Sequence, residues 1–67
     1  MPKYLERMLV EEKDLKGKIK RAEEAVNNPP FDMTKEEIGL LAKQVLSMKE
    51  YLSILEQRIE IAKNKRS

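Results

Sequence analysis

The 67-residue chain contains no cysteine, no histidine and no tryptophan, and its only aromatic side chains are two tyrosines and one phenylalanine. Without cysteine there can be no disulfide, no thiolate metal site and no thiol nucleophile. The absence of histidine removes the commonest metal ligand and the commonest general base. A chain this short buries a thin core and commonly needs a disulfide, a metal or association with other copies for stability. Association is the one of these three that the composition leaves open.

A strong excess of one charge and a long apolar run are missing as well. The 14 basic side chains are nearly balanced by 12 acidic ones, which gives a net charge of +2. This excess is too small to predict binding to duplex nucleic acid. The longest apolar run, residues 38–42, is far shorter than a membrane span, and residues 1–4 lack the apolar centre of a signal peptide. We therefore expect no membrane partner and a cytoplasmic location.

Heptad periodicity is what the sequence has in abundance. In the second half, eight consecutive positions at alternating spacings of three and four residues are apolar: Ile38, Leu41, Val45, Met48, Leu52, Leu55, Ile59 and Ala62. Such spacing places all eight side chains on one face of a single helix. The first half carries a shorter seam of the same kind, interrupted only by Glu12: Leu5, Met8, Leu15, Ile19, Ala22 and Val26.

The segment Asn27-Asn28-Pro29-Pro30 between the two seams is typical of a helix end. Asparagine tolerates the left-handed conformation that closes many helices, and proline cannot continue a helix. Pro2 is favoured in a first helical turn. We predict a first helix over about 2–26 and a loop over 27–33, with Phe31 packed beneath the loop.

The second helix has a clear start. Thr34 and Glu37 have the spacing of a capping box, in which each side chain bonds the other residue's backbone amide. The helix should run over about 35–63 and be followed by a basic tail at 64–67. The sequence thus predicts one all-α domain over residues 1–67, an antiparallel two-helix hairpin that assembles into a homo-oligomeric helical bundle.

The second helix has more apolar surface than one partner helix can cover. Beside the main seam lies a second stripe of mixed character, formed by Leu40, Gln44, Ser47, Tyr51, Ile54, Arg58 and Ile61. A single partner helix covers only a narrow seam. The surplus predicts packing against other copies, at an interface that is partly polar or that also lines a pocket.

Catalysis finds no support in the sequence. Acidic residues are adjacent at 11–12, 23–24 and 36–37, but neighbours on a helix point about 100° apart, so these carboxylates do not converge. Solvated faces with salt bridges explain them better. No serine, threonine or lysine has a plausible activating base. We predict that the protein is not an enzyme and uses no metal and no cofactor.

Charged side chains in two places allow two interpretations each. Glu12 either reaches solvent at a widened stretch of the seam or pairs with Arg58 or a lysine and fixes the register. Basic side chains recur at helical spacing around Gly17, at Lys13, Lys16 and Lys20. They form either a solvated face or a cluster that holds a ligand with several phosphates.

The tyrosines also allow two interpretations. Tyrosine on a polar-flanked helix usually packs with its hydroxyl toward water. Alternatively, a tyrosine beside a phosphate-binding cation can serve as a stacking platform for a base. Tyr4 with Arg7 and Tyr51 with Arg58 both have such a neighbour at helical spacing.

A resemblance to a known family rests on two sets of residues. The first set is Tyr4, Glu6, Arg7, Met8, Glu12 and Leu15, and the second is Leu40, Leu41, Gln44, Met48, Tyr51, Leu55, Arg58 and Ile59. In this spacing they resemble the small phage-encoded hairpin domain of anti-CBASS protein two, which is also found in an inhibitor of the Thoeris system. The resemblance covers nearly the whole chain. Any heptad hairpin would share the leucines, so the polar and aromatic positions of the second half are its most specific part.

The resemblance implies a homo-oligomer, for which a hexamer is one arrangement, acting as a sponge in the cytoplasm of the host bacterium. Such a sponge binds the cyclic di- or trinucleotide messengers of bacterial antiphage defence and sequesters them without cleavage. By this similarity, ligand or oligomer contacts are expected at Tyr4, Arg7, Gln44, Tyr51 and Arg58. The basic cluster adds Lys13, Lys16 and Lys20 as candidate phosphate contacts.

Two other functions are consistent with the sequence. In the first, the hairpin is a structural or adaptor module whose second stripe docks a different protein. The second, a regulator that binds nucleic acid, fits less well because the net charge is nearly neutral.

Overall fold

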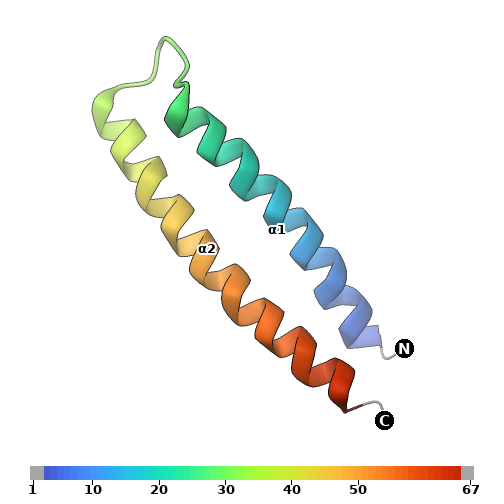
Figure 1. The fold of residues 1–67 in the computed structure, drawn as a ribbon. Coiled ribbons are helices and arrows are strands. Elements are labelled where there is room, and N and C mark those ends of the chain that lie inside the picture. The colour runs from blue at the N-terminus through green and yellow to red at the C-terminus, as the bar shows by residue number, and fades with distance from the viewer. Residues whose placement is uncertain (1–2, 66–67) are drawn as a thin grey trace.

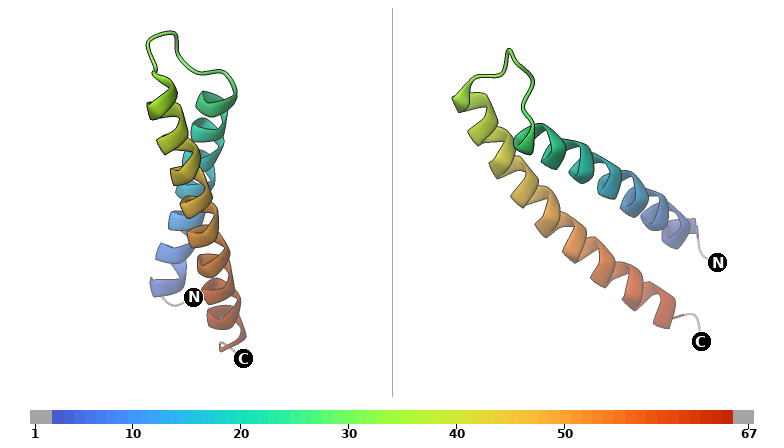
Figure 2. Two further views of the ribbon diagram at one scale, coloured as in Figure 1. Left: turned by 90° about the vertical axis from the view of Figure 1, so that its left-hand side faces the viewer. Right: turned by 45° about the horizontal axis from the view of Figure 1, so that its top comes forward.

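The computed structural model describes residues 3–65, which form two helices and no strand, α1 (Lys3–Asn27) and α2 (Lys35–Asn64). The helices lie antiparallel and side by side, with the loop at one end and both chain ends at the other (Figure 1). Further views show the same elongated pair, which measures 51 × 15 × 14 Å (Figure 2). The predicted all-α hairpin is therefore confirmed, while its assembly into an oligomer stays a prediction.

The helices end within one residue of the sequence-based expectation. α1 continues to Asn27 instead of stopping at residue 26, and α2 continues to Asn64 instead of residue 63. The expected first-turn position of Pro2 and the last two residues of the basic tail, 66–67, lie outside the described residues. In the described part of the chain, no helix is both long and apolar enough to cross a membrane.

The start of α2 is fixed by the capping box that the sequence predicts. The Glu37 amide donates to the Thr34 hydroxyl at 3.1 Å, and the Thr34 amide donates to the Glu37 carboxylate at 2.9 Å. Thr34 has extended backbone angles, φ −79° and ψ 162°, as expected of an N-cap. The bond from the Thr34 amide, followed by the bond with its hydroxyl, holds the pKa of Glu37 below its ordinary value of 4.5.

The loop differs from the sequence-based expectation in two respects. No non-glycine residue in the range 3–65 has a positive φ, so α1 is not closed by a left-handed asparagine. Instead, the Asn28 amide continues the helical pattern by donating to the Glu24 carbonyl at 2.8 Å. The prediction that Phe31 packs beneath the loop is wrong, because its side chain is fully exposed. A turn in which the Met33 amide donates to the Pro30 carbonyl at 3.0 Å places Phe31 at its tip.

The core is the contact between the two predicted seams. Every seam position is buried or partly buried, and the fully buried side chains are Leu5 and Leu55. The largest buried cluster lies at the open end of the hairpin, far from the loop, and consists of Leu5, Met8, Leu55, Ile59 and Ala62. No polar side chain of residues 3–65 is buried. Burial of apolar surface between the helices is thus the main force that holds them together.

Candidate functional site

The second stripe of α2 is exposed along its whole length. The four large apolar or aromatic members are each about half exposed or more, Leu40 at 61%, Tyr51 at 49%, Ile54 at 60% and Ile61 at 57%. The polar members Gln44, Ser47 and Arg58 are exposed as well. The predicted surplus of apolar surface is therefore present on the single hairpin, and α1 does not cover it.

Two shallow grooves on this side of the hairpin contain Arg58. One, of about 210 Å³, lies at the open end and is lined by Tyr4, Met8, Arg58, Ile61, Ala62 and Lys65. The other, of about 140 Å³, is lined by Tyr51, Ile54, Leu55 and Arg58. Arg58 thus shares a groove with each of two aromatic rings, one from each helix.

A third groove, of about 440 Å³, also crosses from α1 to α2. It is lined by Arg7, Val10, Glu11, Asp14, Leu15, Lys18 and Tyr51. Tyr51 therefore shares one groove with Arg7 and another with Arg58. We call the surface formed by Tyr4, Arg7, Tyr51 and Arg58 the tyrosine–arginine face.

The structure groups these four residues differently from the sequence-based expectation. The sequence pairs Tyr4 with Arg7 on one helix, whereas the open-end groove joins Tyr4 to Arg58 on the other helix. Arg7 in turn joins Tyr51 in the largest groove. The expected neighbours Tyr51 and Arg58 do share a groove. Antiparallel packing brings the early residues of α1 beside the late residues of α2, and this produces the cross-helix pairs.

A hydrogen bond between the helices lies in the largest groove. The Tyr51 hydroxyl donates to the Glu11 carboxylate. This bond raises the pKa of Tyr51 above its ordinary value of 10.0, with smaller contributions in the same direction from burial and from the Glu11 charge, while the Arg58 charge lowers it. Ionisation of Tyr51 would remove the proton of this hydrogen bond and place a second negative charge beside the Glu11 carboxylate, which is why the pKa rises.

The charges of the grooves are unequal. The open-end groove contains two cations, Arg58 and Lys65, and no acid. The largest groove contains the cations Arg7 and Lys18, together with two acids, Glu11 and Asp14. An anionic group is therefore attracted more strongly to the open end of the tyrosine–arginine face than to its middle.

Sequence reasoning missed Glu11, Lys18 and Lys65 as groove residues. A signal for them exists, because Tyr4, Glu11 and Lys18 are spaced by seven residues and so share one flank of α1. Directly after the end of α2, Lys65 follows Arg58 by seven residues in the same way. A search for seven-residue repeats outside the core seam would have found all three.

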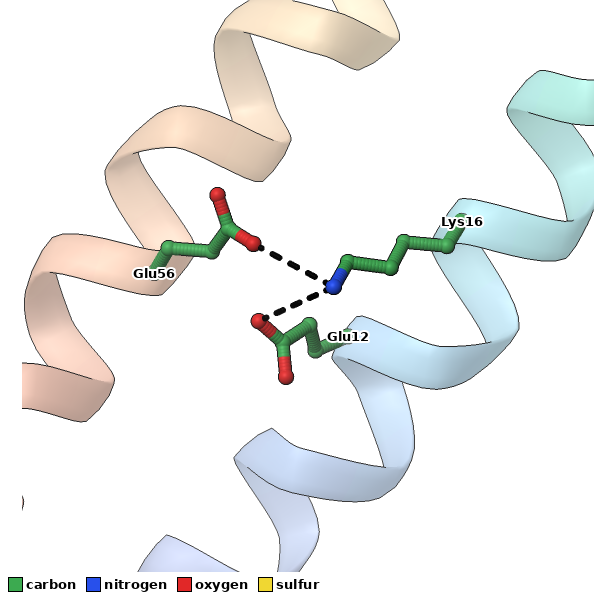
Figure 3. Close-up of polar contacts among 3 residues, drawn as sticks. All are labelled: Glu12, Lys16 and Glu56. Carbon is green, nitrogen blue, oxygen red and sulfur yellow. Dashed lines mark ion pairs between the residues drawn. The ribbon is translucent and has the colours of Figure 1, made fainter.

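Lys16, predicted as a phosphate contact, has two acidic partners. Its ammonium lies 3.8 Å from the Glu12 carboxylate on the same helix and 3.5 Å from the Glu56 carboxylate on α2 (Figure 3). Glu12 is therefore paired with a lysine, as one interpretation expected, although its side chain keeps 22% exposure as the other expected. A second cross-helix pair, Glu23 with Lys49 at 2.5 Å, lies one heptad further from the open end. The two cross-helix pairs, Lys16 with Glu56 and Glu23 with Lys49, are seven residues apart on each helix and are therefore consistent with a single register between α1 and α2.

The remaining predicted residues are dispersed. Lys13 and Lys20 are exposed on α1 and line none of the grooves described above. Gln44 is exposed on α2 and also lies outside these grooves. At Gly17 an added Cβ would meet the Arg21 guanidinium at 3.3 Å, so a neighbouring side chain occupies the space above the glycine. Within residues 3–65 no three acidic side chains are placed to hold a metal ion together.

The antiparallel helices, with shallow and partly basic grooves on an exposed side, define a small all-α hairpin protein. The chain belongs to the Sequestin family, whose family model matches residues 2–61. Neither a curated protein nor a solved structure matches it. The name of the family indicates sequestration, which agrees with the predicted class of function and does not identify the ligand.

Proposed function

We propose that this protein is a phage immune-evasion sponge that binds cyclic oligonucleotide messengers of bacterial antiphage defence and sequesters them without cleaving them. The observation that carries the proposal is the position of Arg58, which shares one groove with Tyr4 and another with Tyr51. A base can stack on a tyrosine ring while an arginine pairs with the adjoining phosphate. The Sequestin membership supports a binding role of this type.

The charge of the grooves supports a ligand with few negative charges. The open-end groove offers Arg58 and Lys65 to a phosphate. In the largest groove, Glu11 and Asp14 disfavour additional anionic groups. A cyclic di- or trinucleotide carries only phosphodiesters, each with a single charge, whereas opening the ring by hydrolysis converts one of them into a terminal phosphate with up to two charges. The proposed sponge therefore prefers cyclic to linear nucleotides.

Association of several hairpins is part of the proposal. The grooves are shallow and open, and most small ligands are held in sites that cover the larger part of their surface. A second hairpin placed over the exposed stripe of α2 would enclose a ligand from the other side. We therefore propose that the sponge is a homo-oligomer acting in the cytoplasm of the infected bacterium.

Calorimetric titration of the purified protein with a panel of cyclic di- and trinucleotides tests the proposal, with their linear counterparts as controls. We expect binding of at least one cyclic compound, and recovery of that compound intact after the protein is denatured. Tyr51→Ala and Arg58→Glu should each weaken binding at least tenfold, since they remove a stacking ring and reverse a phosphate-pairing charge. Leu46→Ala changes an exposed apolar side chain outside the stripe and should leave the affinity unchanged. A flat response across the whole panel would refute the sponge.

The second candidate is an adaptor hairpin that sequesters a protein. The half-exposed apolar side chains of the stripe favour it, because large exposed apolar patches commonly mark protein interfaces. Under this alternative, Tyr51→Ala abolishes capture of the protein partner, and no cyclic nucleotide changes the thermal stability of the hairpin.

A further inference from the structure

We propose that two copies of this chain associate through the exposed stripe of α2, with the two α2 helices antiparallel and Tyr51 close to the two-fold axis. The occupant of the stripe is thus a second copy of the same surface. Three observations carry this inference, namely the spacing of the stripe, the similar chemistry of its two ends and its exposure on the single hairpin.

The spacing of the stripe is that of a second coiled-coil seam. Its members, Leu40, Gln44, Ser47, Tyr51, Ile54, Arg58 and Ile61, alternate between steps of four and three residues. This is the same periodicity as the seam that packs on α1, displaced around the helix by roughly a quarter of a turn. A seam of seven positions extends over about 30 Å of helix and requires a helical partner of similar length. Among the described helices, α1 is already occupied by the first seam.

The two halves of the stripe have similar chemistry except at one pair of positions, where Ser47 is the counterpart of Ile54. Leu40 and Ile61 form its apolar ends, and the polar side chains Gln44 and Arg58 come next from either side. Tyr51 lies in the middle. In an antiparallel pair related by a two-fold axis, each residue meets the counterpart from the other end of the stripe.

This pairing satisfies the one charged side chain of the stripe. It brings Arg58 of each copy to the level of the second copy's Gln44, whose amide oxygen accepts hydrogen bonds from a guanidinium. A parallel pair in register would instead place the two Arg58 side chains against each other, and like charges at such positions are destabilising. The sequence therefore favours the antiparallel arrangement over the parallel one.

Exposure provides the driving force. Four large side chains of the stripe are about half exposed or more on the single hairpin, and association removes this apolar surface from water. The hairpin itself has a thin core, in which Leu5 and Leu55 are the only fully buried side chains of residues 3–65. A chain of this size without a disulfide commonly gains its stability from association.

The pairing also explains a residue that the single hairpin leaves isolated. Within one chain, Gln44 and Arg58 are 14 residues apart, which is about 21 Å along α2. They cannot hold one small ligand together. The second copy brings its own Gln44 beside the Tyr4–Arg58 groove, so the dimer has two equivalent sites, each composed of residues from both chains. This assignment of the sites rests on the proposed function, whereas the pairing of the helices does not.

Disulfide cross-linking of single-cysteine variants without ligand tests the pairing, and the chain has no native cysteine to interfere. We expect Tyr51→Cys to cross-link to itself under mild oxidation. Leu40→Cys and Ile61→Cys should not cross-link alone, but should do so with each other when the two variants are co-expressed. Leu46→Cys, an exposed control outside the stripe, should stay monomeric on a denaturing gel. Self-linking of Leu40→Cys and Ile61→Cys would indicate a parallel pair and overturn the proposal, as would the absence of any link.

Sedimentation velocity provides a second test that does not depend on cysteine. Wild-type protein should sediment as a dimer at micromolar concentration, Ile54→Glu as a monomer, and Leu46→Glu as a dimer. Circular dichroism shows whether each variant keeps its helices. A monomeric wild type, or an Ile54→Glu variant that remains helical and dimeric, contradicts the pairing. None of these measurements involves a nucleotide, so failure of the pairing is distinguishable from failure of the sponge.

Discussion

The Tyr51 hydroxyl on α2 donates a hydrogen bond to the Glu11 carboxylate on α1, and this bond lies in the largest of the three grooves described above. It orients the tyrosine ring relative to α1. It also keeps a negative charge in the groove that contains the cations Arg7 and Lys18. The same contact thus affects both the aromatic and the electrostatic properties of the tyrosine–arginine face, and it leads to two predictions.

Glu11→Gln should lower the pKa of Tyr51 toward its ordinary value, because the charged acceptor that favours the neutral phenol is removed. Ultraviolet absorbance against pH measures this titration, and Tyr51→Phe identifies which part of the signal belongs to Tyr51. The raised pKa also has a consequence for stability. The contact contributes fully below the ordinary tyrosine pKa of about 10, and its contribution is lost as the pH rises through the pKa of the folded protein. An unchanged titration in Glu11→Gln would show that the hydrogen bond does not persist in solution.

The same substitution should strengthen binding of anionic ligands, because it removes one of two acids from a groove that also contains Arg7 and Lys18. For exposed charges the expected gain is about two- to fivefold in affinity, and it should be larger for linear nucleotides with a terminal phosphate than for cyclic ones. The gain should decrease as salt is added. Glu60→Gln removes an exposed acid that lines none of the grooves and should have no comparable effect. Weaker binding by Glu11→Gln would instead assign Glu11 a direct contact with the ligand.

Thr34→Ala should destabilise the hairpin by about 1 kcal/mol, the usual cost of losing an N-cap. Thr34→Ser keeps the hydroxyl and should be close to wild type. The bonds of Thr34 to the Glu37 carboxylate also lower the pKa of Glu37, so the stability from these bonds is present above the ordinary value of 4.5 and is lost as the pH falls through the pKa of the folded protein. Thr34→Ala keeps the backbone amide that donates to this carboxylate and loses only the hydroxyl, which accepts from the Glu37 amide at any pH. Urea denaturation should therefore separate wild type from Thr34→Ala at both neutral and acidic pH, with the larger difference at neutral pH.

Leu55→Ala should destabilise the protein by about 2–5 kcal/mol, because it removes a fully buried side chain from the cluster at the open end. For a chain of this size such a loss is comparable with the whole stability. Leu46→Ala makes the same chemical change at a side chain that is 64% exposed and should change stability by less than about 0.5 kcal/mol. Thermal denaturation followed by circular dichroism measures both. Equal effects of the two substitutions would contradict the observed packing of α2.

Glu12→Leu should stabilise the protein by about 1 kcal/mol. Glu12 occupies a seam position, and an apolar side chain there buries more surface than a carboxylate at 22% exposure. The loss of its pair with Lys16 costs little, because the lysine also pairs with Glu56. Glu24→Leu adds the same side chain to an exposed position and should not stabilise. A lower melting temperature for Glu12→Leu would mean that the Glu12–Lys16–Glu56 contacts are needed for the register.

Periodicity and capping chemistry predict much of this fold because they are properties of single helices. The two seams, the capping box at Thr34 and the exposed second stripe are each determined by spacing along one segment. The groove that Tyr4 and Arg58 share is not, since it depends on the register between the helices. That register follows from the fit of two core surfaces, which spacing within one helix does not encode.

Two further failures have similar causes. Phe31 is apolar and was expected inside, but the turn that begins at Pro30 places it at the tip of the loop. Lys16 belongs to a cluster of cations in the sequence, yet the structure pairs it with Glu12 and Glu56. In both cases the outcome depends on backbone and neighbours contributed by another part of the chain.

The best-buried cluster lies at the end of the hairpin opposite the loop, and this has a consequence for how the chain folds. Even its closest cross-helix members in sequence, Met8 and Leu55, are 47 residues apart. Closing so long a segment costs more chain entropy than pairing residues next to the loop. Helix pairing that spreads outward from the turn is therefore not enough to stabilise the hairpin. Folding should instead depend on contact between the two segments that are distant in sequence. In hydrogen exchange, the slowest amides should accordingly be found near the chain ends, where fraying is ordinarily greatest.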